Sequence, residues 1–486
     1  MAPTEHRHIV VIGAGFGGIG LAIKLREAGF DDLVVLERAA DLGGTWQANT
    51  YPGCACDVPS QLYSYSFAPN PDWSRTYGKQ SEILAYIRSV ATRFDVVRDI
   101  RLNTELLEAR WDEARSLWRL ETSQGALTTD YLISATGVFA EAKYPTLPGV
   151  ETFAGATFHS LHWDHDHDLT GERVAVIGTG ASAVQFVPEI QPKVAALTVF
   201  QRSAPWIVPR MDRPTLAVER FALRRIPLAG KVIRGAWYTA IEGFGLVGFV
   251  DKRFRHPYEL LGRWQLRRQV RDPELREKLT PDYMIGCKRA IFADAYLPAL
   301  DKDNVEVVTD GIAEVRPHSI LTRAGVEIPV DTIIYGTGFE PAPSSYDRIV
   351  GGDGVSVGEV MRKHRRTYLG TAVAGFPNLF LTLGPFGAAG NQSAIFMIES
   401  QIAYIVDAVK TLRDKGAHRV EVRQQVQDAF VEEMHRRSAD TVWLTGGCDS
   451  YYTTPDGQNA GLYPNWSFEY RRRTSAFDAE SYEVSA

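Results

Sequence analysis

Residues 158–169 read FHSLHWDHDHDL, a stretch rich in side chains that can bind metals or move protons. Its imidazole and carboxylate groups are His159, His162, His165, His167, Asp164, Asp166 and Asp168. Imidazoles and carboxylates this close together can ligate a transition metal or act as a general acid–base cluster. Residues of these types also form ordinary solvated loops. Their spacing alone does not choose among these interpretations, so the surrounding elements must.

A glycine-rich turn near the N-terminus has the arrangement of a dinucleotide-binding loop. A β-branched run over residues 9–12 predicts a strand, a helical pattern follows the turn, and Gly29 is placed to end that helix. The glycines of the turn are Gly13, Gly15 and Gly18. They permit, in order, a tight turn, close approach of a pyrophosphate and close packing of helix on strand. A second strand, 33–36, leads to Glu37, whose carboxylate can bind the ribose hydroxyls of an adenosine.

The same pattern recurs further along the chain. Residues 173–177 predict a strand that leads into a second turn, which contains Gly178, Gly180 and Ser182. The next strand, 196–200, is followed by Arg202 and not by an acid. A carboxylate there favours NAD, whereas an arginine accommodates the 2′-phosphate of NADP, although an arginine at a strand end can also be a plain solvated charge. The two units together predict two dinucleotide sites in one α/β chain.

Two further apolar strands end in a small-Thr-Gly turn, one at Gly137 and one at Gly338. They resemble segments of flavoproteins that bind two dinucleotides, where the chain crosses between an FAD domain and an NADP domain, and both fit the first site. The resemblance implies two Rossmann-like domains: an FAD-binding domain of residues 1–145 and 338–486, and an NADP-binding domain of residues 146–337. Residues 212–285 have few strand signals and predict a helical insert in the NADP domain.

The stretch after Glu37 indicates which group can accept electrons from the reduced cofactor. Disulfide reductases of this general fold have a redox dithiol here, but Trp46 occupies the position suited to the first cysteine. Cys54 and Cys56 are separated by one residue, which is poor geometry for an unstrained disulfide. We interpret both as packing residues. Electrons taken from NADPH then have no thiol relay to enter, which favours dioxygen as their acceptor.

Read from Phe153 onward, the histidine-rich stretch matches the pattern FxGxxxHxxxW followed by Pro or Asp. The matching residues are Phe153, Gly155, His159, Trp163 and Asp164. This pattern resembles the fingerprint of type I Baeyer–Villiger monooxygenases, and it stands just before the second Rossmann strand, as in that family. The stretch after Glu37 resembles the family's second signature through Gly44, Thr45, Trp46 and Asp57. The resemblance covers nearly the whole chain.

The resemblance bears on whether the histidines of residues 158–169 form a metal site. It implies a structural or conformational role for His159 at the hinge between the domains, and no metal. The other three histidines are then expected on a solvated loop, where HxH and HxxH spacing still allows some adventitious affinity for zinc or nickel.

The resemblance also implies a chemistry. FAD and NADPH are the cofactors, and one oxygen atom of dioxygen is inserted next to a ketone carbonyl, through a flavin C4a-peroxide and a tetrahedral adduct, to give an ester or lactone. Arg289 matches the family's active-site arginine, and Asp57 is expected to pair with it across the domains. Arginine suits this role because it stays charged when desolvated. Lys288 is expected to join Arg202 on the 2′-phosphate. A plain interdomain salt bridge is the alternative interpretation of the pair.

The C-terminal half contains three features with open interpretations. Residues 384–391 are rich in glycine and end at Asn391, before a helix predicted from about Ser393, whose N-terminus could face the pyrimidine edge of the flavin. The aromatic residues between 443 and 466 resemble the branch acting on aryl and linear ketones, and either wall a substrate pocket or pack in the core. The apolar stretch 235–250 could line the pocket or carry an access surface.

Composition and charge limit the remaining possibilities. The chain has 486 residues and a net charge of −6, which gives no reason to expect nucleic acid as a partner. The apolar stretch 235–250 is interrupted by Glu242 and is too short to span a bilayer. Four cysteines are too few for a disulfide scaffold and indicate a reducing, cytoplasmic setting. We expect a monomer or small homo-oligomer. The alternatives are an oxygenase of amines or sulfides, which Trp163, Asp57 and Arg289 argue against, an NADPH oxidase, and a flavin-binding redox sensor.

Overall fold

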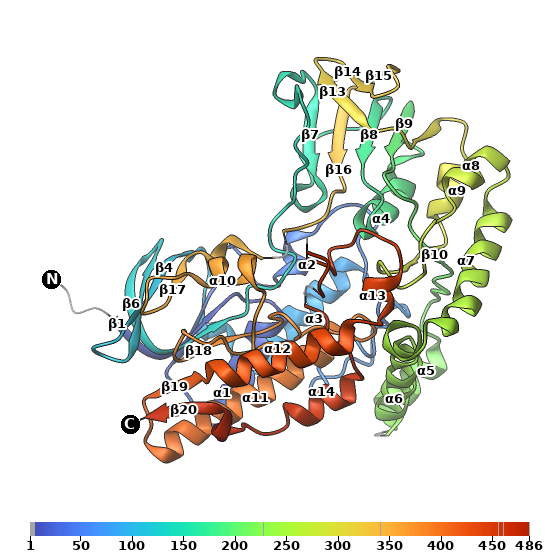
Figure 1. The fold of residues 1–486 in the computed structure, drawn as a ribbon. Coiled ribbons are helices and arrows are strands. Elements are labelled where there is room, and N and C mark those ends of the chain that lie inside the picture. Colours follow the sequence, from blue (N-terminus) through green and yellow to red (C-terminus); the bar gives the residue numbers. More distant parts are fainter. Residues whose placement is uncertain (1–4, 227, 341, 455, 460, 486) are drawn as a thin grey trace.

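The computed structural model of the chain describes residues 5–226, 228–340, 342–454, 456–459 and 461–485. The described chain forms two α/β lobes with a helical segment beside them (Figure 1). In Figure 1 the smaller sheet is at the top, the larger one is at the lower left, and the helices of residues 217–278 run along the right side. Within these described ranges, no helix is both long and apolar enough to cross a membrane.

The larger sheet combines strands from the first part of the chain with two strands from its second half. The strands are β1 (Glu5–Ile12), β2 (Leu33–Leu36), β3 (Ile100–Arg101), β4 (Leu106–Asp112), β5 (Leu117–Thr122), β6 (Gly125–Ser134), β17 (Ile349–Val350) and β18 (Leu379–Leu381). Their order is β17-β4-β5-β6-β1-β2-β3, and β18 pairs with the end of β6. The strands β3, β2, β1 and β6 are mutually parallel, whereas β4, β5 and β6 form an antiparallel meander. The parallel half holds the first glycine loop.

The helices of this lobe come from both ends of the chain. They are α1 (Phe16–Glu27), α2 (Thr45–Ala48), α3 (Gln80–Arg93), α10 (Val357–Lys363), α11 (Ala394–Lys415), α12 (Gln424–Ser438), α13 (Val442–Thr445) and α14 (Ser467–Arg473). The short helices α2 and α13 lie toward the junction of the lobes (Figure 1). Helices α1 and α11 are in close contact, because a Cβ on Gly20 would lie 2.7 Å from Cδ1 of Ile402. Helix α11 begins directly after Ser393, as predicted, and it ends at Gly416, which has a φ of 63°. The terminal strands β19 (Arg419–Val422) and β20 (Tyr482–Ser485) pair antiparallel.

The smaller sheet is entirely parallel. Its strands are β7 (Ala156–His159), β8 (Arg173–Ile177), β9 (Ala196–Phe200), β12 (Val305–Val308) and β16 (Thr332–Tyr335), in the order β12-β9-β8-β16-β7. Helices α4 (Ala181–Ile190) and α9 (Tyr296–Leu300) pack in this lobe, and β13 (Ile312–Arg316), β14 (Ser319–Thr322) and β15 (Glu327–Pro329) form a separate antiparallel sheet. Strands β2, β8 and β9 have the predicted bounds, while β1 starts earlier than predicted, at Glu5. Two parallel Rossmann-like cores confirm the predicted α/β fold class.

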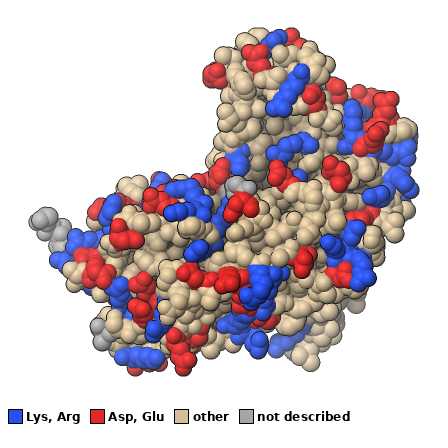
Figure 2. All heavy atoms as spheres, viewed as in Figure 1, with Lys and Arg blue, Asp and Glu red and all other residues tan. Residues whose placement is uncertain are grey.

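The predicted helical insert lies between two short strands of the smaller lobe. Strands β10 (Ile207–Val208) and β11 (Ile291–Phe292) pair in parallel. Between them are α5 (Ala217–Arg225), α6 (Ala229–Glu242), α7 (Arg255–Gln269) and α8 (Pro273–Lys278). The apolar stretch 235–250 forms the second half of α6 and a π-helical turn at Leu246–Val250. Charged side chains of both signs are spread over the face of the molecule shown in Figure 2, which is hollowed between the upper lobe and the lower left body.

Each glycine loop lies against a small-Thr-Gly turn of its own sheet. Gly13 has a φ of +101°, and a Cβ on it would lie 2.7 Å from the carbonyl oxygen of Ala135. Gly178 has a φ of +108°, and its Cβ would lie 2.5 Å from the carbonyl oxygen of Gly336. The expectation that both turns fit the first site is therefore wrong for the turn that ends at Gly338. That turn follows β16, which pairs with β7 and β8 in the smaller sheet.

The first glycine loop yields a prediction for Gly18. A Cβ on Gly18 would lie 1.8 Å from the carbonyl oxygen of Gly13, which is a backbone atom that cannot easily move. We expect Gly18→Ala to destabilise the chain by about 1–3 kcal/mol through overpacking and to reduce the dinucleotide that copurifies with it. Thermal denaturation and the absorbance of the bound cofactor measure both effects.

Gly235→Ala is the matched control for this substitution. Gly235 lies inside α6 with no atom within 4 Å of its would-be Cβ. Alanine is favoured over glycine in a helix interior by roughly 0.5–1 kcal/mol, so this variant should be as stable as the wild type or slightly more stable. Equal melting temperatures and equal cofactor content in the two variants would show that the loop tolerates a side chain.

Candidate functional site

An ion pair between Asp57 and Arg289 joins the two lobes. Asp57 follows α2 in the larger lobe, and Arg289 precedes β11 at the end of the insert. Arg289 Nε donates a hydrogen bond to Asp57 Oδ2 at 2.6 Å. The structure therefore brings together the two residues that the sequence singled out as a catalytic pair. Their side chains retain 33% and 27% exposure, so they border a space and are not sealed in the core.

The two charges of this pair stabilise each other. The Asp57 carboxylate raises the pKa of Arg289 well above its usual value, against the opposing effect of burial. Burial raises the pKa of Asp57, but the charge and hydrogen bond of Arg289 outweigh that effect and hold this pKa below its usual range. Both groups are therefore charged at neutral pH. Within the described residues, no hydrogen bond involves the two terminal nitrogens of Arg289, which leaves these donors for a ligand.

Gln185 makes a second link between the lobes, which sequence reasoning missed. It lies in α4, where its side-chain oxygen accepts hydrogen bonds from Tyr51 Oη at 3.0 Å and from the backbone nitrogen of Ala55 at 3.2 Å. Its Nε2 donates to the carbonyl oxygen of Ala55 at 2.9 Å. A Cβ on Gly53 would lie 2.7 Å from the backbone oxygen of Gln185, so the two segments are in direct contact. A glutamine within a helix is common, and no local pattern distinguishes this one.

The first glycine loop and Glu37 form a cradle that fits an adenosine diphosphate group. Helix α1 begins directly after Gly15, so its unpaired backbone N–H groups face the loop. The buried carboxylate of Glu37 accepts hydrogen bonds from the backbone nitrogens of Ala14 at 2.8 Å and Ala39 at 2.9 Å. Each carboxylate oxygen can accept one more hydrogen bond, so Glu37 remains able to bind ribose hydroxyls.

The second-signature segment extends this cradle toward Asp57. A Cβ on Gly44 would lie 3.0 Å from the Cα of Gly15, so the segment contacts the glycine loop through backbone alone. Thr45 is the first residue of α2. Trp46 is buried, and its Nε1 donates to Tyr63 Oη at 3.1 Å. The segment therefore runs from the first glycine loop to Asp57 at the junction of the lobes.

Asn391 is a buried amide that lacks a protein partner. Neither its Nδ2 nor its Oδ1 has a hydrogen bond within the described residues. A buried polar group left without a partner costs about 1–3 kcal/mol, so a ligand with its own donors and acceptors is expected here. Asn391 lies just before α11, where the sequence predicted the pyrimidine edge of a flavin. The ring edge of a flavin has both kinds of group, and it fits this amide.

Glu242 holds the insert against this region, a role that sequence reasoning did not find. Its carboxylate accepts hydrogen bonds from Gln392 Nε2 at 2.9 Å, from the backbone nitrogen of Ser467 at 2.6 Å and from Ser467 Oγ at 2.7 Å. A Cβ on Gly245 would lie 3.0 Å from Nδ2 of Asn391. The stretch 235–250 therefore packs beside Asn391, which favours the pocket-lining interpretation of that stretch.

Lys288 and Arg202 form a cationic site after β9. Lys288 Nζ donates to Ser203 Oγ at 2.7 Å, beside Arg202 in the sequence. Desolvation and the neighbouring charge of Arg202 lower the pKa of Lys288, so the two cations lie close to each other. In the part of the chain that the structure describes, neither forms an ion pair with a carboxylate. Two cations near the second glycine loop fit a phosphate group such as the 2′-phosphate of NADP.

The second glycine loop precedes a helix in the same way as the first. Helix α4 begins directly after Gly180, and Ser182 lies in its first turn. Backbone N–H groups at such a helix start can bind a pyrophosphate. Gly338, after β16, lies in the turn that contacts this loop.

His159 is buried where the chain crosses between the lobes. Its ring contacts Tyr144 and Phe339, with ring centroids 5.4 and 5.9 Å away, and these two residues belong to the two crossing segments. Its Nδ1 accepts a hydrogen bond from the backbone nitrogen of Leu161 at 3.0 Å. Burial and the nearby His162 lower the pKa of His159 to about 4, so the ring is neutral at physiological pH.

The other fingerprint residues shape the same junction. A Cβ on Gly155 would lie 1.9 Å from the carbonyl oxygen of Asp331, so only glycine fits at this position. The ring of Trp163 packs against Phe158 at 5.2 Å and against Phe186 of α4 at 5.3 Å. The fingerprint therefore ties β7 to the helix that follows the second glycine loop.

Of the remaining histidines, His162 ends a 3-10 turn at Ser160–His162, and His165 and His167 lie on the loop that follows it. His162 and His165 are exposed, as predicted, and His165 Nε2 lies 2.8 Å from Thr50 Oγ1. His167 also lies on this loop, but its side chain is half-buried and lies 3.0 Å from a carboxylate oxygen of Glu172. Among the described residues, no cluster of three or more His, Cys, Asp or Glu side chains could hold a metal ion.

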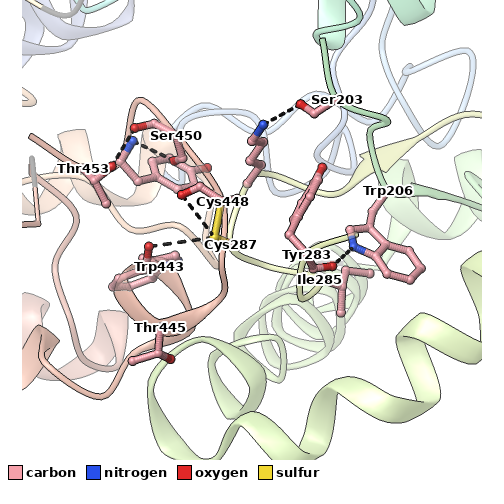
Figure 3. Close-up of a disulfide and its surroundings, with 12 residues drawn as sticks. Ser203, Trp206, Tyr283, Ile285, Cys287, Trp443, Thr445, Cys448, Ser450 and Thr453 are labelled. Atoms are coloured by element: carbon pink, nitrogen blue, oxygen red, sulfur yellow. Dashed lines mark hydrogen bonds between the residues drawn. A yellow bond between two sulfur atoms is a disulfide. The ribbon is translucent and has the colours of Figure 1, made fainter. Parts of the chain in front are cut away.

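The cysteines fall into two classes. Cys54 and Cys56 are buried free thiols, and burial raises the pKa of Cys54 to about 12 and raises the pKa of Cys56 as well. Both are protonated packing residues, as predicted. Cys287 and Cys448 instead form a disulfide (Figure 3). Sequence reasoning did not find this pair, because 161 residues separate the two cysteines and no local pattern connects them.

Tyr451 and Tyr452 of the C-terminal segment lie near Arg289. After Asp57, these two tyrosines are the groups whose charge interactions favour the protonated guanidinium of Arg289. Tyr451 Oη donates to Tyr452 Oη at 3.1 Å. Tyr451 retains 56% exposure, whereas Trp443 and Tyr463 are buried. Of these residues, Tyr451 is exposed and borders the space at Arg289, whereas Trp443 and Tyr463 pack in the core.

A separate cavity of about 960 Å³ lies between α10, α12 and Thr454, Asp456 and Gln458. Its walls carry charges of both signs, including Arg366, Asp428 and Glu432. Asp57 and Arg289 are not among its lining residues, so this cavity is distinct from the site at the junction of the lobes.

Several known proteins resemble this chain in sequence. Residues 10–229 match the family described as pyridine nucleotide-disulphide oxidoreductase. A Baeyer-Villiger monooxygenase of Pseudomonas aeruginosa is 44% identical over 489 residues, which cover 100% of this chain and 92% of that protein. A Baeyer-Villiger monooxygenase of Streptomyces coelicolor is also 44% identical, over 99% of this chain and 93% of that protein.

Solved structures of monooxygenases also resemble this chain. Cyclohexanone monooxygenase from Rhodococcus sp. Phi1 bound to NADP+ superposes with a TM-score of 0.89 at 28% identity, over 100% of both chains. Oxidized steroid monooxygenase bound to NADP superposes with a TM-score of 0.86 at 29% identity, over 99% of both chains.

Two nucleotide-binding lobes that meet at a buried hinge and a fixed cation define a flavoprotein oxidoreductase with FAD and NADPH as cofactors. The curated relatives identify the family within this class of flavoproteins. The chain belongs to the family of Baeyer–Villiger monooxygenases, as its two signatures predicted.

The neutral state of His159 makes stability depend on pH. The pKa of His159 is about 4 in the folded chain and about 6.5 in an unfolded one, so between these values only the unfolded chain takes up this proton. The contribution is fully present above about pH 6.5 and is lost as the pH falls toward 4, by about 2 kcal/mol at pH 5. We expect wild type to lose roughly that much more stability than His159→Gln between pH 7 and pH 5, measured by denaturant unfolding.

His162→Gln is the control, because His162 is an exposed neighbour of the same type. Its stability should follow the pH dependence of the wild type. If wild type and His159→Gln lost equal stability over this pH range, the buried ring would not be the neutral hinge residue described above.

Proposed function

We propose that this monooxygenase converts a ketone, with dioxygen and NADPH, into the corresponding ester or lactone. The observation that carries the proposal is the Asp57–Arg289 pair, a fixed cation with unused donors at the junction of the two nucleotide-binding lobes. The relatives named Baeyer-Villiger, cyclohexanone and steroid monooxygenase support the same reaction class. When bound, FAD that has been reduced by NADPH supplies the chemistry that activates dioxygen.

We assign the cofactor sites from the contacts described above. The residues assigned to FAD are Gly13, Gly15, Gly18, Glu37, Gly44, Thr45, Trp46, Asp57, Gly137 and Asn391. The residues assigned to NADPH are Gly178, Gly180, Ser182, Arg202, Lys288 and Gly338. The unpartnered amide of Asn391 and the two cations after β9 are the strongest support for these assignments.

Arg289 acts on the charge that develops during the reaction. Attack of an oxygen nucleophile on a ketone carbonyl places negative charge on the carbonyl oxygen. Arg289 stabilises that oxygen, because its guanidinium stays protonated and its terminal nitrogens are free to donate. Asp57 holds the guanidinium from the other lobe, so the cation is in place only when the lobes meet. Tyr451 borders the same space and limits the entry of water.

The domain boundaries proposed from the sequence are 1–145 with 338–486 for FAD, and 146–337 for NADPH. They agree with the extent of the sheets, since strands of the larger sheet lie within residues 5–134 and 349–381 and those of the smaller sheet within 156–335. The aromatic C-terminal segment supports an aryl or linear ketone as substrate. We place the enzyme in the cytoplasm, where NADPH is regenerated, as a monomer or small homo-oligomer.

Replacement of Arg289 tests the proposed reaction. We expect Arg289→Ala to form ester about 10²–10³-fold more slowly, the usual cost of removing a donor from a developing oxyanion. Reduction of bound FAD by NADPH should persist, so the electrons should appear as hydrogen peroxide. Ester and peroxide are measured in the same reaction, by gas chromatography and by a peroxidase assay.

Arg220→Ala, which removes an exposed arginine of α5, is the control and should keep the wild-type rate. Ester formation at an unchanged rate in Arg289→Ala would remove Arg289 from the reaction. A wild-type enzyme that gave only peroxide with ketones, or that oxygenated only amines and sulfides, would overturn the proposed function itself.

The cationic site after β9 makes a prediction about cofactor choice. A hydrogen bond to a charged group contributes about 1.5–3 kcal/mol, so Arg202→Ala and Lys288→Ala should each raise KM for NADPH by about 10–100-fold. KM for NADH, which lacks the 2′-phosphate, should stay nearly constant. Steady-state kinetics with both nucleotides measure the ratio, and Lys193→Ala, at an exposed lysine after α4, is the control. Equal losses for NADPH and NADH would place these cations away from the 2′-phosphate.

A further inference from the structure

The Cys287–Cys448 disulfide joins two segments that meet at the proposed active site. Lys288 and Arg289 directly follow Cys287, while Tyr451 and Tyr452 come shortly after Cys448. Figure 3 shows the bond between the turn that contains Tyr283 and Ile285 and the segment that runs from Trp443 past Ser450 to Thr453. One covalent bond therefore connects the cations of the smaller lobe to the tyrosines that border the space at Arg289.

The contact around the bond is tight on the side of Cys287. This residue is fully buried, and a Cβ on Gly446 would lie 2.6 Å from its Cβ. The backbone nitrogen of Met284 donates to the carbonyl oxygen of Gly446 at 2.9 Å. Trp206 Nε1 donates to the carbonyl oxygen of Tyr283 at 2.8 Å and holds the turn on the smaller lobe. The turn is thus a fixed base for whatever is attached to Cys287.

The segment on the other side of the bond has weaker attachments of its own. Ser450 accepts hydrogen bonds from the backbone nitrogen of Tyr452 and from Thr453 Oγ1, both at 2.9 Å. Within the described residues, the hydrogen bonds of 449–453 stay inside the C-terminal segment. The next firm attachment is at Asn459, whose Nδ2 donates to Ser438 Oγ at 2.8 Å. The disulfide and the hydrogen bond from Met284 to Gly446 therefore fix the near end of this segment. The buried ring of Tyr452 packs with Trp443 and Leu462.

We propose that the Cys287–Cys448 disulfide is a redox-controlled positioning link for the active site. When the bond is closed, Tyr451 is held beside Arg289 and the reaction space is shielded from water. When the bond is open, residues 447–453 loosen, the ketone binds less tightly, and more of the electrons from NADPH leave as hydrogen peroxide. The proposal rests on the proposed function. The two cysteines are positioning residues, because they act only through the side chains attached beside them.

The chemistry of opening and closing is balanced. A dithiol opens the link by thiol–disulfide exchange: it becomes a disulfide, and its two electrons and two protons produce the two protein thiols. Hydrogen peroxide closes the link. One thiolate displaces hydroxide from the peroxide to form a sulfenic acid, the other thiol displaces water from that sulfur, and two thiols and one peroxide become a disulfide and two waters. Cys448 is the more exposed of the two residues, since it is half-buried and Cys287 is fully buried.

The proposed cytoplasmic location of the enzyme implies that the disulfide can open and close. Disulfides in the cytosol are usually transient, catalytic or redox-sensing, because cytosolic thiols are kept reduced. Hydrogen peroxide is also what the enzyme releases when dioxygen activation is not followed by ketone oxidation. Uncoupled turnover therefore produces the oxidant that closes the link and restores coupling.

The test compares the oxidised and reduced forms of the wild-type FAD-loaded enzyme. Dithiothreitol opens the link, and gel filtration then removes the dithiothreitol. Peptide mass spectrometry verifies the redox state of Cys287 and Cys448. We expect reduction to raise both the peroxide share of NADPH consumption and the KM for ketone by roughly fivefold or more, the range of a typical coupling between sites. Reduction of bound FAD by NADPH should stay nearly unchanged, and added hydrogen peroxide should reverse both effects.

Cys448→Ser holds the link open without removing a fully buried atom. This variant should behave like reduced wild type and should not respond to dithiothreitol or to peroxide. Cys54→Ala removes a buried free thiol and should keep the wild-type response to both reagents. Amide hydrogen exchange of residues 447–453 adds a readout that does not depend on the reaction, and it should speed up in reduced wild type and in Cys448→Ser.

The outcomes separate this proposal from the proposed function. If oxidised and reduced wild type form ester with the same KM and peroxide share, the link has no positioning role and the proposed function stands. If neither state forms ester from a ketone, but reduction speeds hydrogen exchange in 447–453 and increases peroxide release, the proposed function fails and the link stands. Unchanged hydrogen exchange in the reduced enzyme would also overturn the positioning link.

Discussion

The structure depends on a charged pair whose two partners come from different lobes. Removing a cation from water costs several kcal/mol unless a carboxylate lies within hydrogen-bond distance, so Arg289 needs Asp57. Because no strand pairing among the described residues connects the two sheets, other contacts must bring the partners together. Gln185 supplies one such contact through three hydrogen bonds, and the buried ring of His159 supplies another between the two crossing segments. Of the fingerprint residues, His159 contacts both crossing segments, whereas Gly155 and Trp163 pack within the smaller lobe beside them.

The same junction receives the ends of both nucleotide-binding units. His159 ends β7 and the turn at Gly338 follows β16, so the carboxyl edge of the smaller sheet faces the crossing segments. Ligands of open α/β sheets bind at this edge. In the larger lobe, the first glycine loop leads through Gly44 to Asp57, and the unpartnered amide of Asn391 lies where α11 begins. The candidate cofactor cradles and the fixed cation are thus parts of one arrangement, in which we propose that Arg289 stands where a flavin and a nicotinamide would meet.

Sequence reasoning succeeded where a local physical requirement leaves a local trace. Gly13 and Gly178 occupy left-handed or closely packed backbone positions that only glycine fits, and the β-branched runs before them became strands at the predicted places. The Asp57–Arg289 pair was found only through the family signatures, because nothing in the types of these residues distinguishes them from other charges.

What the sequence could not reveal are contacts between distant segments made by ordinary residues. Glu242 stands out in the sequence only as a break in an apolar stretch, yet it binds Gln392 and Ser467 and fixes the insert. Cys287 and Cys448 are likewise separated by 161 residues, and their pairing requires the turn before Arg289 to meet the C-terminal segment.

The central claim is that Asp57 and Arg289 act as one unit, and a double-mutant cycle on ester formation tests it most directly. The rates of Asp57→Ala, Arg289→Ala and the double variant are compared with that of the wild type. Residues that act as a unit have strongly non-additive effects, so the double variant should be little slower than the slower single variant. If the two losses instead add in free energy, the carboxylate and the guanidinium contribute independently, and the account of a cation positioned from the opposite lobe is contradicted.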